Sequence, residues 1–227
     1  MKHSRTLLTA FLLALALFFA LSSGKIYEKT VFSFAETKTV YLTFDDGPSD
    51  RVTPLVLDVL KKEKVPATFF LVGAQMEERE DLVKRIYAEG HAIGIHTYTH
   101  EYRKIYASAE SLLTDIERTR RKIESLTGIS PTIYRFPGGS FSVREELKKA
   151  VKKAGYTYID WNCCCRDEEL ARPTAKELYE ATVKTAEGKN QVVLLCHDST
   201  THRATAEALP SIISYFRDRG FVFAKLS

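Results

Sequence analysis

Residues 40–48, VYLTFDDGP, join an apolar run to two adjacent carboxylates and a tight turn. The run predicts a buried strand, and the Gly-Pro pair is typical of a turn that ends one. Neighbouring carboxylates repel each other unless a cation or hydrogen-bond donors neutralise them, so Asp45 and Asp46 indicate a metal ion, a catalytic base or both. A solvated turn is the simpler alternative, because Asp-Gly-Pro forms turns without any further role.

Short apolar runs alternate with amphipathic stretches along the rest of the chain. Capping-box patterns at Ser142-x-x-Glu145 and Thr174-x-x-Glu177 mark two helix starts, and glycine follows most of the expected helices. This repeat predicts an α/β fold whose parallel sheet is either closed as a barrel or open and doubly wound. The expected strands are residues 39–44, 67–71, 92–95, 132–135, 156–160, 191–195 and 221–224. The expected helices are residues 53–63, 75–89, 108–127, 142–154, 174–187 and 204–219.

The chain divides into a distinct N-terminus and one domain with a full core, which 227 residues allow. Residues 1–24 are typical of an export signal, because Lys2 and Arg5 precede an apolar run that ends in small residues. We expect either a cleaved signal peptide or an uncleaved membrane anchor, and both would place the domain outside the cytoplasm, secreted or at the cell surface. Residues 25–38 would form a lead-in, and residues 39–227 the domain.

The overall charge argues against one class of partner. A net charge of +4 is modest, and no stretch rich in Lys and Arg is interleaved with aromatic residues. We therefore expect no nucleic acid as the main partner. Contact with a membrane is expected only through an uncleaved anchor, and we expect a monomer.

The four cysteines form an unusual pattern for an exported protein, with Cys163, Cys164 and Cys165 in a row and Cys196 far downstream. Adjacent cysteines rarely bridge each other, because a disulfide needs a particular separation and direction. Three alternatives stay open: packed or surface thiols, a disulfide from one of the three to Cys196, and a thiolate metal site.

Two histidines follow the expected strand at residues 92–95, in His96-Thr97-Tyr98-Thr99-His100. If the chain turns into a helix there, the two imidazoles share a face and can bind one ion. Either histidine alone would more often be solvated or packed in a core. Together with Asp46 at another strand end, they make a set of three N/O ligands, which is typical of a catalytic divalent site and usually of zinc.

Polar groups also follow three later strands. Arg135 would hold a carboxylate ionised, and Gly138 lets a backbone N–H approach an oxyanion. Trp161, next to Asp160, suits a sugar ring at the mouth of a site, although a lone tryptophan is more often in a core. Alternation along residues 191–197 directs Leu195 and His197 to the crevice and Cys196 to the helical layer. Because the carboxyl ends of parallel strands lie at one edge, these groups are expected to converge.

Taken in order, these segments closely resemble the polysaccharide deacetylases, carbohydrate esterase family 4. The resemblance covers nearly the whole expected domain, and it implies a distorted, incomplete (β/α) barrel of about seven parallel strands with outer helices. The five matching segments are residues 43–48, 96–100, 135–138, 160–161 and 195–197.

The resemblance also implies a division of roles. Asp45 would be the general base, with Arg135 orienting it. A divalent metal ion, Zn²⁺ first with Co²⁺, Mn²⁺ or Ni²⁺ as alternatives, would be bound by Asp46, His96 and His100.

The remaining roles concern the leaving group and the acetyl group. His197 would be the general acid, and Asp160 would tune it. Trp161 and Leu195 would form the acetyl pocket, while the N–H of Gly138 would help hold the oxyanion. One departure is Gly138 itself, where many relatives carry an aromatic residue, so one side of the sugar site should be more open.

The function implied is metal-dependent removal of acetyl groups from N-acetylglucosamine units of an extracellular glycan. Peptidoglycan is the first candidate, because the domain would lie against the cell wall, and chitin-type oligomers are the second. Two alternatives stay open: an O-acetyl esterase acting on xylan with the same metal, and an inactive carbohydrate-binding barrel.

Overall fold

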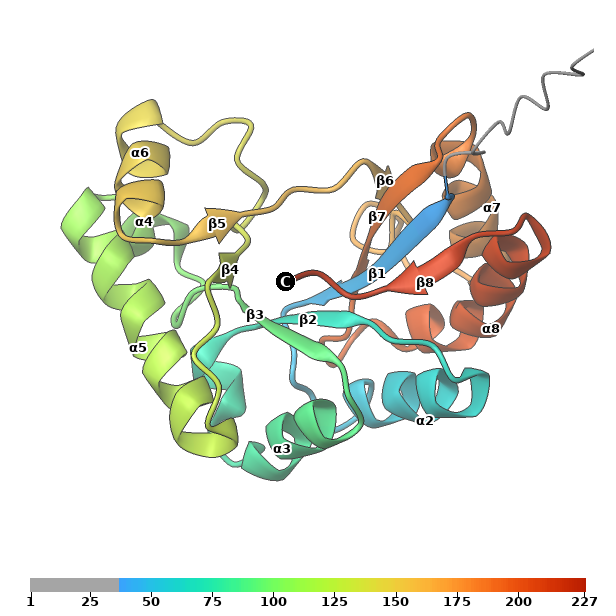
Figure 1. The fold of residues 1–227 in the computed structure, drawn as a ribbon, viewed down its shortest axis with the longest axis horizontal. Helices are drawn as coiled ribbons and strands as arrows, with labels where there is room; N and C mark the ends of the chain where they lie inside the picture. Colours follow the sequence, from blue (N-terminus) through green and yellow to red (C-terminus); the bar gives the residue numbers. More distant parts are fainter. Residues whose placement is uncertain (1–36) are drawn as a thin grey trace, which may run out of the picture. The chain divides into compact units, whose positions relative to one another are not determined.

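The computed structural model describes residues 37–227, which form a curved parallel sheet with helices around its outside (Figure 1). The strands are β1 (Thr39–Asp45), β2 (Thr68–Leu71), β3 (Ala92–Ile95), β4 (Ile133–Tyr134), β5 (Thr157–Tyr158), β6 (Cys163–Cys164), β7 (Gln191–His197) and β8 (Val222–Ala224). They lie in the order β5-β4-β3-β2-β1-β7-β6, and β8 pairs with the first half of β1. Among these described strands no ladder joins β5 to β6, so the barrel is incomplete.

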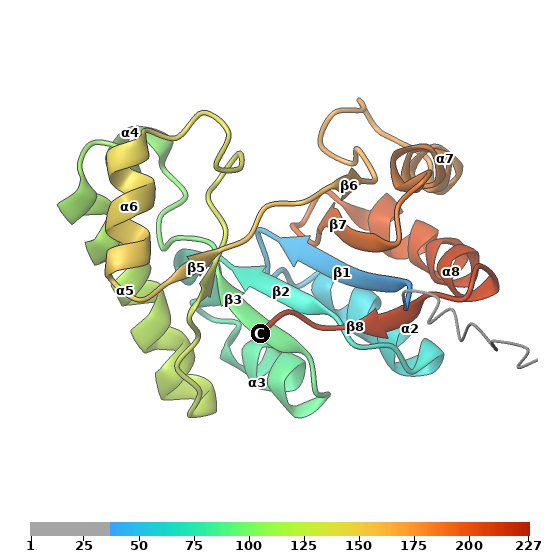
Figure 2. The same cartoon turned by 45° about the horizontal axis from the view of Figure 1, so that its top comes forward.

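The helices cover the outer face of the sheet, as Figures 1 and 2 show from two directions. They are α2 (Thr53–Glu63), α3 (Glu80–Ala88), α4 (Tyr102–Ile105), α5 (Ala109–Thr127), α6 (Glu145–Lys153), α7 (Ala175–Ala186) and α8 (Arg203–Asp218), and a 3₁₀ turn, η1, spans Gly73–Met76. In α5 the hydroxyl of Ser108 accepts a hydrogen bond from the N–H of Ser111 and caps the first turn. Its buried residues Leu112, Ile116 and Ile123 recur at helical spacing, so one face packs inward.

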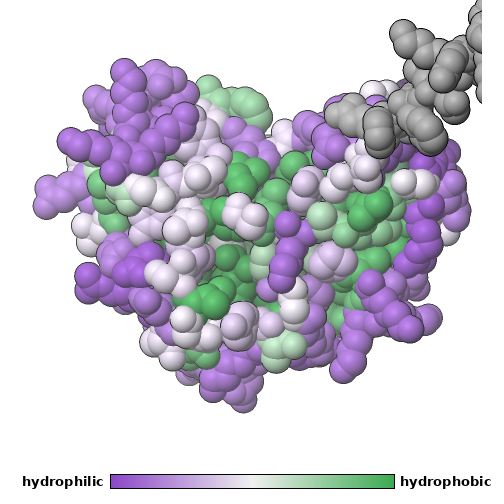
Figure 3. All heavy atoms as spheres, viewed as in Figure 1, coloured by the Kyte–Doolittle hydropathy of each residue, from purple (hydrophilic) through white to green (hydrophobic). Residues whose placement is uncertain are grey.

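The core is built around β1, which pairs with both β2 and β7. Val40, Leu42 and Phe44 are fully buried, and the ring of Phe44 stacks on that of Phe69 with centroids 5.1 Å apart. Burying each such side chain stabilises the fold by roughly 1.5–3 kcal/mol. In the view of Figure 3, apolar residues gather over the centre, where Figure 1 shows the strands, and hydrophilic residues gather over the helices around it. This core holds the carboxyl end of β1 in a fixed position.

The predicted architecture is confirmed, with corrections at particular elements. All seven expected strands are present, but β6 is an additional strand that the cysteine triplet does not suggest. The capping box at Thr174 is present, whereas α6 begins at Glu145 with no side-chain cap, so the one expected at Ser142 is wrong. Residues 75–89 divide between η1 and the shorter helix α3.

All four cysteines are free thiols, and Cys163, Cys165 and Cys196 are buried. Among the three alternatives, the structure therefore agrees with packed thiols and not with a disulfide to Cys196. The expected signal or anchor in residues 1–24, and nearly all of the lead-in at residues 25–38, lie outside the described residues. Within residues 37–227 no helix has the length and apolar character needed to cross a membrane.

Candidate active site

The two carboxylates of the opening segment lie where β1 ends. Asp45 is the last residue of β1 and is only 2% exposed, whereas Asp46 leaves the strand with a φ of 72°. Aspartate is among the few residues that tolerate positive φ, because its short polar side chain can bond locally. Gly47 is required next, since a Cβ at this position would overlap the carboxylate of Asp198. The turn gives Asp45 and Asp46 different partners.

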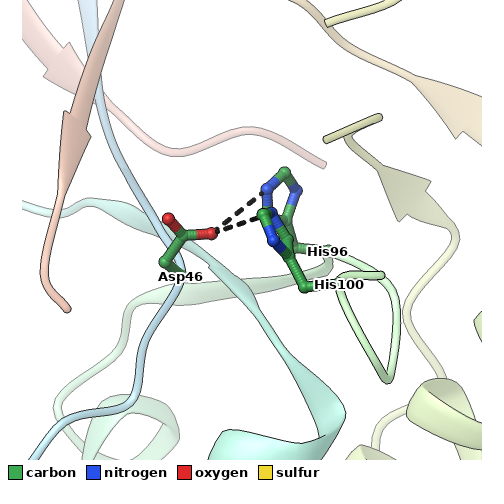
Figure 4. A group of neighbouring side chains, drawn as sticks. All are labelled: Asp46, His96 and His100. Carbon is green, nitrogen blue, oxygen red and sulfur yellow. Dashed lines mark ion pairs between the residues drawn. The ribbon is translucent and has the colours of Figure 1, made fainter. Parts of the chain in front are cut away.

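Asp46 faces two imidazoles from the loop after β3 (Figure 4). Its Oδ1 lies 3.4 Å from Nε2 of His96 and 3.3 Å from Nε2 of His100. This oxygen is buried and has no hydrogen-bond partner, which is costly unless a cation neutralises it. Because the three ligand atoms lie within 4.8 Å of one another, the two imidazoles and the carboxylate fit a divalent metal ion with open positions.

The orientation of His96 is fixed by a contact on the far side of its ring. Its Nδ1 lies 2.9 Å from the carbonyl oxygen of Arg135, which leaves Nε2 directed at Asp46. Burial lowers the pKa of His96 to about 3. The imidazole is therefore neutral at physiological pH, the form that binds a metal ion.

The loop that carries both histidines, residues 96–101, is irregular, so the helix considered there as a condition for metal binding is absent. Thr97 and His100 have φ values of 66° and 55°, which a right-handed helix excludes. The carboxylate of Asp115 on α5 accepts hydrogen bonds from two backbone N–H groups of the loop and ties it to that helix. The two imidazoles still meet, with ring centroids 5.1 Å apart.

Arg135 is fully buried beside Asp45. Its Nη1 donates to Oδ1 of Asp45 at 2.9 Å and to Oγ1 of Thr43 at 2.7 Å, and its Nε donates to the carbonyl of Ile159 at 2.9 Å. Burial raises the pKa of Asp45, while the nearby charges of Arg135 and His197 partly oppose this. The expected contact between Arg135 and Asp45 is present, and it fixes the orientation of the carboxylate.

His197 ends β7 directly beside Asp45, its register partner on β1. Its Nδ1 lies 2.8 Å from Oδ1 of Asp167, and the other oxygen of Asp167 accepts the backbone N–H of His197 at 2.7 Å. Burial would lower the pKa of His197, but the hydrogen bond and charge of Asp167 raise it to about 9. Burial would likewise raise the pKa of Asp167, yet the contacts with His197 hold it below its usual value. His197 is therefore protonated at neutral pH.

Since Asp167 is the partner of His197, the expected tuning of His197 by Asp160 is wrong. The carboxylate of Asp160 instead accepts hydrogen bonds from the N–H of Ser140, at 2.9 Å, and from its hydroxyl. The reason lies in the strand order. Asp160 follows β5, which pairs with β4, whereas Asp167 follows β6, which pairs with the strand that carries His197.

A cleft of about 170 Å³ gathers most of the expected site residues at the carboxyl ends of the strands. Arg135 and Asp160 do not line the cleft. Any effect they have on the reaction would pass through residues that they contact. Gly138 adopts a φ of 74°, which favours glycine, and is exposed in the cleft. The expected residues that line the cleft are Asp45, Asp46, His96, His100, Gly138, Trp161, Leu195 and His197.

Six further residues line the cleft that the sequence analysis does not place there: Tyr102, Cys164, Arg166, Asp167, Glu168 and Glu169. Among them, Tyr102, Asp167 and Glu168 contact a histidine of the site. The two acids follow β6, so the rule that polar groups gather at carboxyl strand ends would identify them once the cysteine run is taken as an apolar strand. Tyr102 packs edge-on against the ring of His100, with centroids 5.6 Å apart. Its sequence context carries no comparable signal.

Comparison with known proteins assigns the chain to a family. The sequence profile described as Polysaccharide deacetylase matches residues 34–159, more than half of the chain. The chain belongs to the polysaccharide deacetylase family. A peptidoglycan-N-acetylglucosamine deacetylase of Bacillus cereus is 35% identical over 196 residues, which cover 85% of this chain and 70% of that protein.

Solved structures of polysaccharide deacetylases agree with this assignment. A carbohydrate esterase family 4 esterase of Streptococcus mutans superposes with a TM-score of 0.79 at 34% identity, covering 84% of this chain and 87% of the other. The polysaccharide deacetylase Bc1974 of Bacillus cereus gives a TM-score of 0.78 at 33% identity, covering 84% and 92%. The resemblance inferred from the short segments is confirmed, and so is the expectation of a hydrolase of the polysaccharide deacetylase type.

Proposed function

We propose that this protein is a metal-dependent deacetylase that hydrolyses the acetamide of N-acetylglucosamine units in an extracellular glycan. The observation that carries the proposal is the arrangement of a metal-ligand set, a buried carboxylate and a protonated imidazole around one cleft. Asp45 and His197 flank this cleft from adjacent strands. An acid and a base on neighbouring strands suit hydrolysis of a bond whose leaving group needs a proton.

Asp46, His96 and His100 would hold the divalent ion, with Zn²⁺ the first candidate because imidazole and carboxylate ligands suit it. Co²⁺, Mn²⁺ and Ni²⁺ are the alternatives for the same three ligands. When bound, the ion would polarise the acetamide carbonyl and lower the pKa of a water molecule that it binds from 15.7 toward about 7.

Asp45 would take the proton of the attacking water. Its hydrogen bond to Arg135 leaves the other oxygen, Oδ2, on the side of His96 at 4.0 Å from Nε2. This geometry keeps one oxygen engaged and the second available as the base. The backbone N–H of Gly138, in the cleft wall, would donate to the oxyanion.

His197 would then protonate the leaving nitrogen. An amine anion is a very poor leaving group, so breakdown of the tetrahedral intermediate needs an acid that is charged at neutral pH. The contact with Asp167 keeps Nδ1 engaged and raises the pKa of His197 to about 9, so Nε2 carries the proton to be transferred. Trp161 and Leu195 line the same cleft and would enclose the acetyl methyl group.

Peptidoglycan is the proposed substrate, supported by the relatives that carry its name and by the export-like residues 1–24. Both support a site of action outside the cytoplasm. Chitin-type oligomers are the second choice for the same chemistry.

The test is acetate release from three substrates: peptidoglycan, an N-acetylglucosamine oligomer and acetylated xylan. We expect release from the two N-acetylated glycans, with peptidoglycan the faster, and only slow release from xylan. Release confined to xylan would indicate the O-acetyl esterase, and no release from any of them, with zinc supplied, would indicate a binding barrel.

A further inference from the structure

Glu168 lies at the mouth of the cleft next to the proposed general acid. Its Oε2 is 3.5 Å from Nε2 of His197, the ring nitrogen that Asp167 leaves free. The side chain is 55% exposed, so its carboxylate is held in the open part of the cleft rather than in the core. Neither the metal-ligand set nor the pair formed by Asp45 and Arg135 involves this residue.

The position of Glu168 matters because of where the leaving nitrogen must be. A proton donor has to come within about 3 Å of the atom it protonates. The leaving nitrogen therefore lies beside Nε2 of His197 during the reaction, and a carboxylate oxygen 3.5 Å from Nε2 is its neighbour. The ligand atoms of Asp46, Glu168 and His197 also lie within 4.8 Å of one another, so two carboxylates lie near this nitrogen and attract positive charge there.

We propose that Glu168 binds the leaving nitrogen as it becomes positively charged, and thereby makes the site selective for acetamides over acetate esters. The proposal rests on the proposed function. It adds a residue that touches the reacting nitrogen and gives a reason for preferring amides.

The chemistry accounts for the selectivity. His197 gives its Nε2 proton to the nitrogen of the tetrahedral intermediate, so that nitrogen carries a positive charge before the C–N bond breaks. The electron pair of that bond then stays on nitrogen, which releases acetic acid and the neutral sugar amine. The acetic acid gives its proton to the amine, so the products are acetate and an ammonium group, and the proton that Asp45 took from water returns to His197. An ester releases a neutral alcohol at the same point. A carboxylate beside the leaving atom thus stabilises the amide reaction and its product, and contributes nothing comparable to an ester.

The test compares wild type with Glu168→Gln in the zinc-loaded enzyme, using an N-acetylglucosamine oligomer and an activated acetate ester. We expect kcat on the oligomer to fall about tenfold, and the rate on the ester to change by less than about twofold. Rates are compared at about pH 6, below the pKa of about 9 of His197, so that His197 stays protonated in both proteins.

A binding measurement separates this proposal from the proposed function. A tetramer of glucosamine presents the ammonium product without requiring turnover, and calorimetry should show about tenfold weaker binding to Glu168→Gln than to wild type. If wild type binds the tetramer through Glu168 but releases no acetate from any N-acetylated glycan, the proposed function fails and the ammonium site stands.

Glu207→Gln is the matched control, because the side chain of Glu207 is 54% exposed, pairs with Arg203 at 2.9 Å and lies outside the cleft lining. It should match wild type in both measurements. Equal losses on amide and ester in Glu168→Gln, or unchanged binding of the tetramer, would overturn the proposal, because Glu168 would then act only through His197 or through folding.

Discussion

Asp46→Ala is expected to lose both the bound metal ion and turnover, whereas Asp45→Asn should keep the ion and lose turnover. Asp46 supplies the buried oxygen that faces both imidazoles, so its removal leaves two ligands where three are needed. Asp45 instead contacts Arg135, and asparagine keeps its shape without its basicity. We expect Asp45→Asn to lower kcat by on the order of 10²–10⁴-fold.

The measurement is metal content by mass spectrometry and acetate release, made on the same preparations after gel filtration. Asparagine rather than alanine is chosen at position 45 because Arg135 is fully buried and needs a partner. Circular dichroism checks that both variants are folded. Full turnover in either variant would contradict the assignment of base and ligand.

Asp167→Asn is the second large effect, and Asp160→Asn is its matched control. Asp167 holds Nδ1 of His197 and raises its pKa to about 9, so the amide substitution removes the charge that keeps the imidazole protonated. By analogy with the aspartate of a Ser-His-Asp triad, kcat on an acetamide should fall by on the order of 10³-fold. The carboxylate of Asp160 contacts Ser140, so Asp160→Asn should cost less than about threefold.

The pH profile distinguishes tuning of His197 from a structural effect. His197 must be protonated to act as the acid, so activity is present below its pKa and is lost as pH rises through about 9. Without the charge of Asp167 this pKa falls, and the alkaline limb of kcat/KM should move to lower pH by about one unit or more. The assignment to Asp167 would be contradicted if the alkaline limb of kcat/KM stayed in place in Asp167→Asn. A shift of that limb in Asp160→Asn would return the tuning of His197 to Asp160.

Much of the fold is predictable because strand and helix patterns alternate clearly along the chain. The run at residues 40–44 is apolar except for Thr43, and it becomes most of the central strand β1. The same rule places Asp45, Asp46 and His197 at one edge of the sheet, and they do meet in one cleft. These residues can be located without knowledge of strand pairing, because each stands at or directly after the carboxyl end of a seven-residue strand.

The exchange of Asp160 and Asp167 shows where sequence reasoning fails. Both acids follow strands of two residues, β5 and β6, too short for any periodic pattern. Asp160 stands beside the only tryptophan and therefore attracts attention, but the sheet is interrupted between β5 and β6. Only the pairing of β6 with β7 shows that Asp167 is the neighbour of His197.

The two histidines converge as predicted, but not on the face of a helix. A spacing of four residues suggests a helix face, yet His96 and His100 meet across an irregular loop with positive φ values. Asp115, distant in sequence, shapes this loop from α5. Ligand spacing alone therefore predicts that two side chains converge more reliably than it predicts the backbone between them.

Acetate release by chelated protein, measured against Zn²⁺ added per chain, tests the central claim most directly. If Asp46, His96 and His100 form one catalytic metal site, release from an N-acetylglucosamine oligomer should be absent without metal, rise with added Zn²⁺ and level off at about one ion per chain. Undiminished release from the fully chelated protein would contradict it.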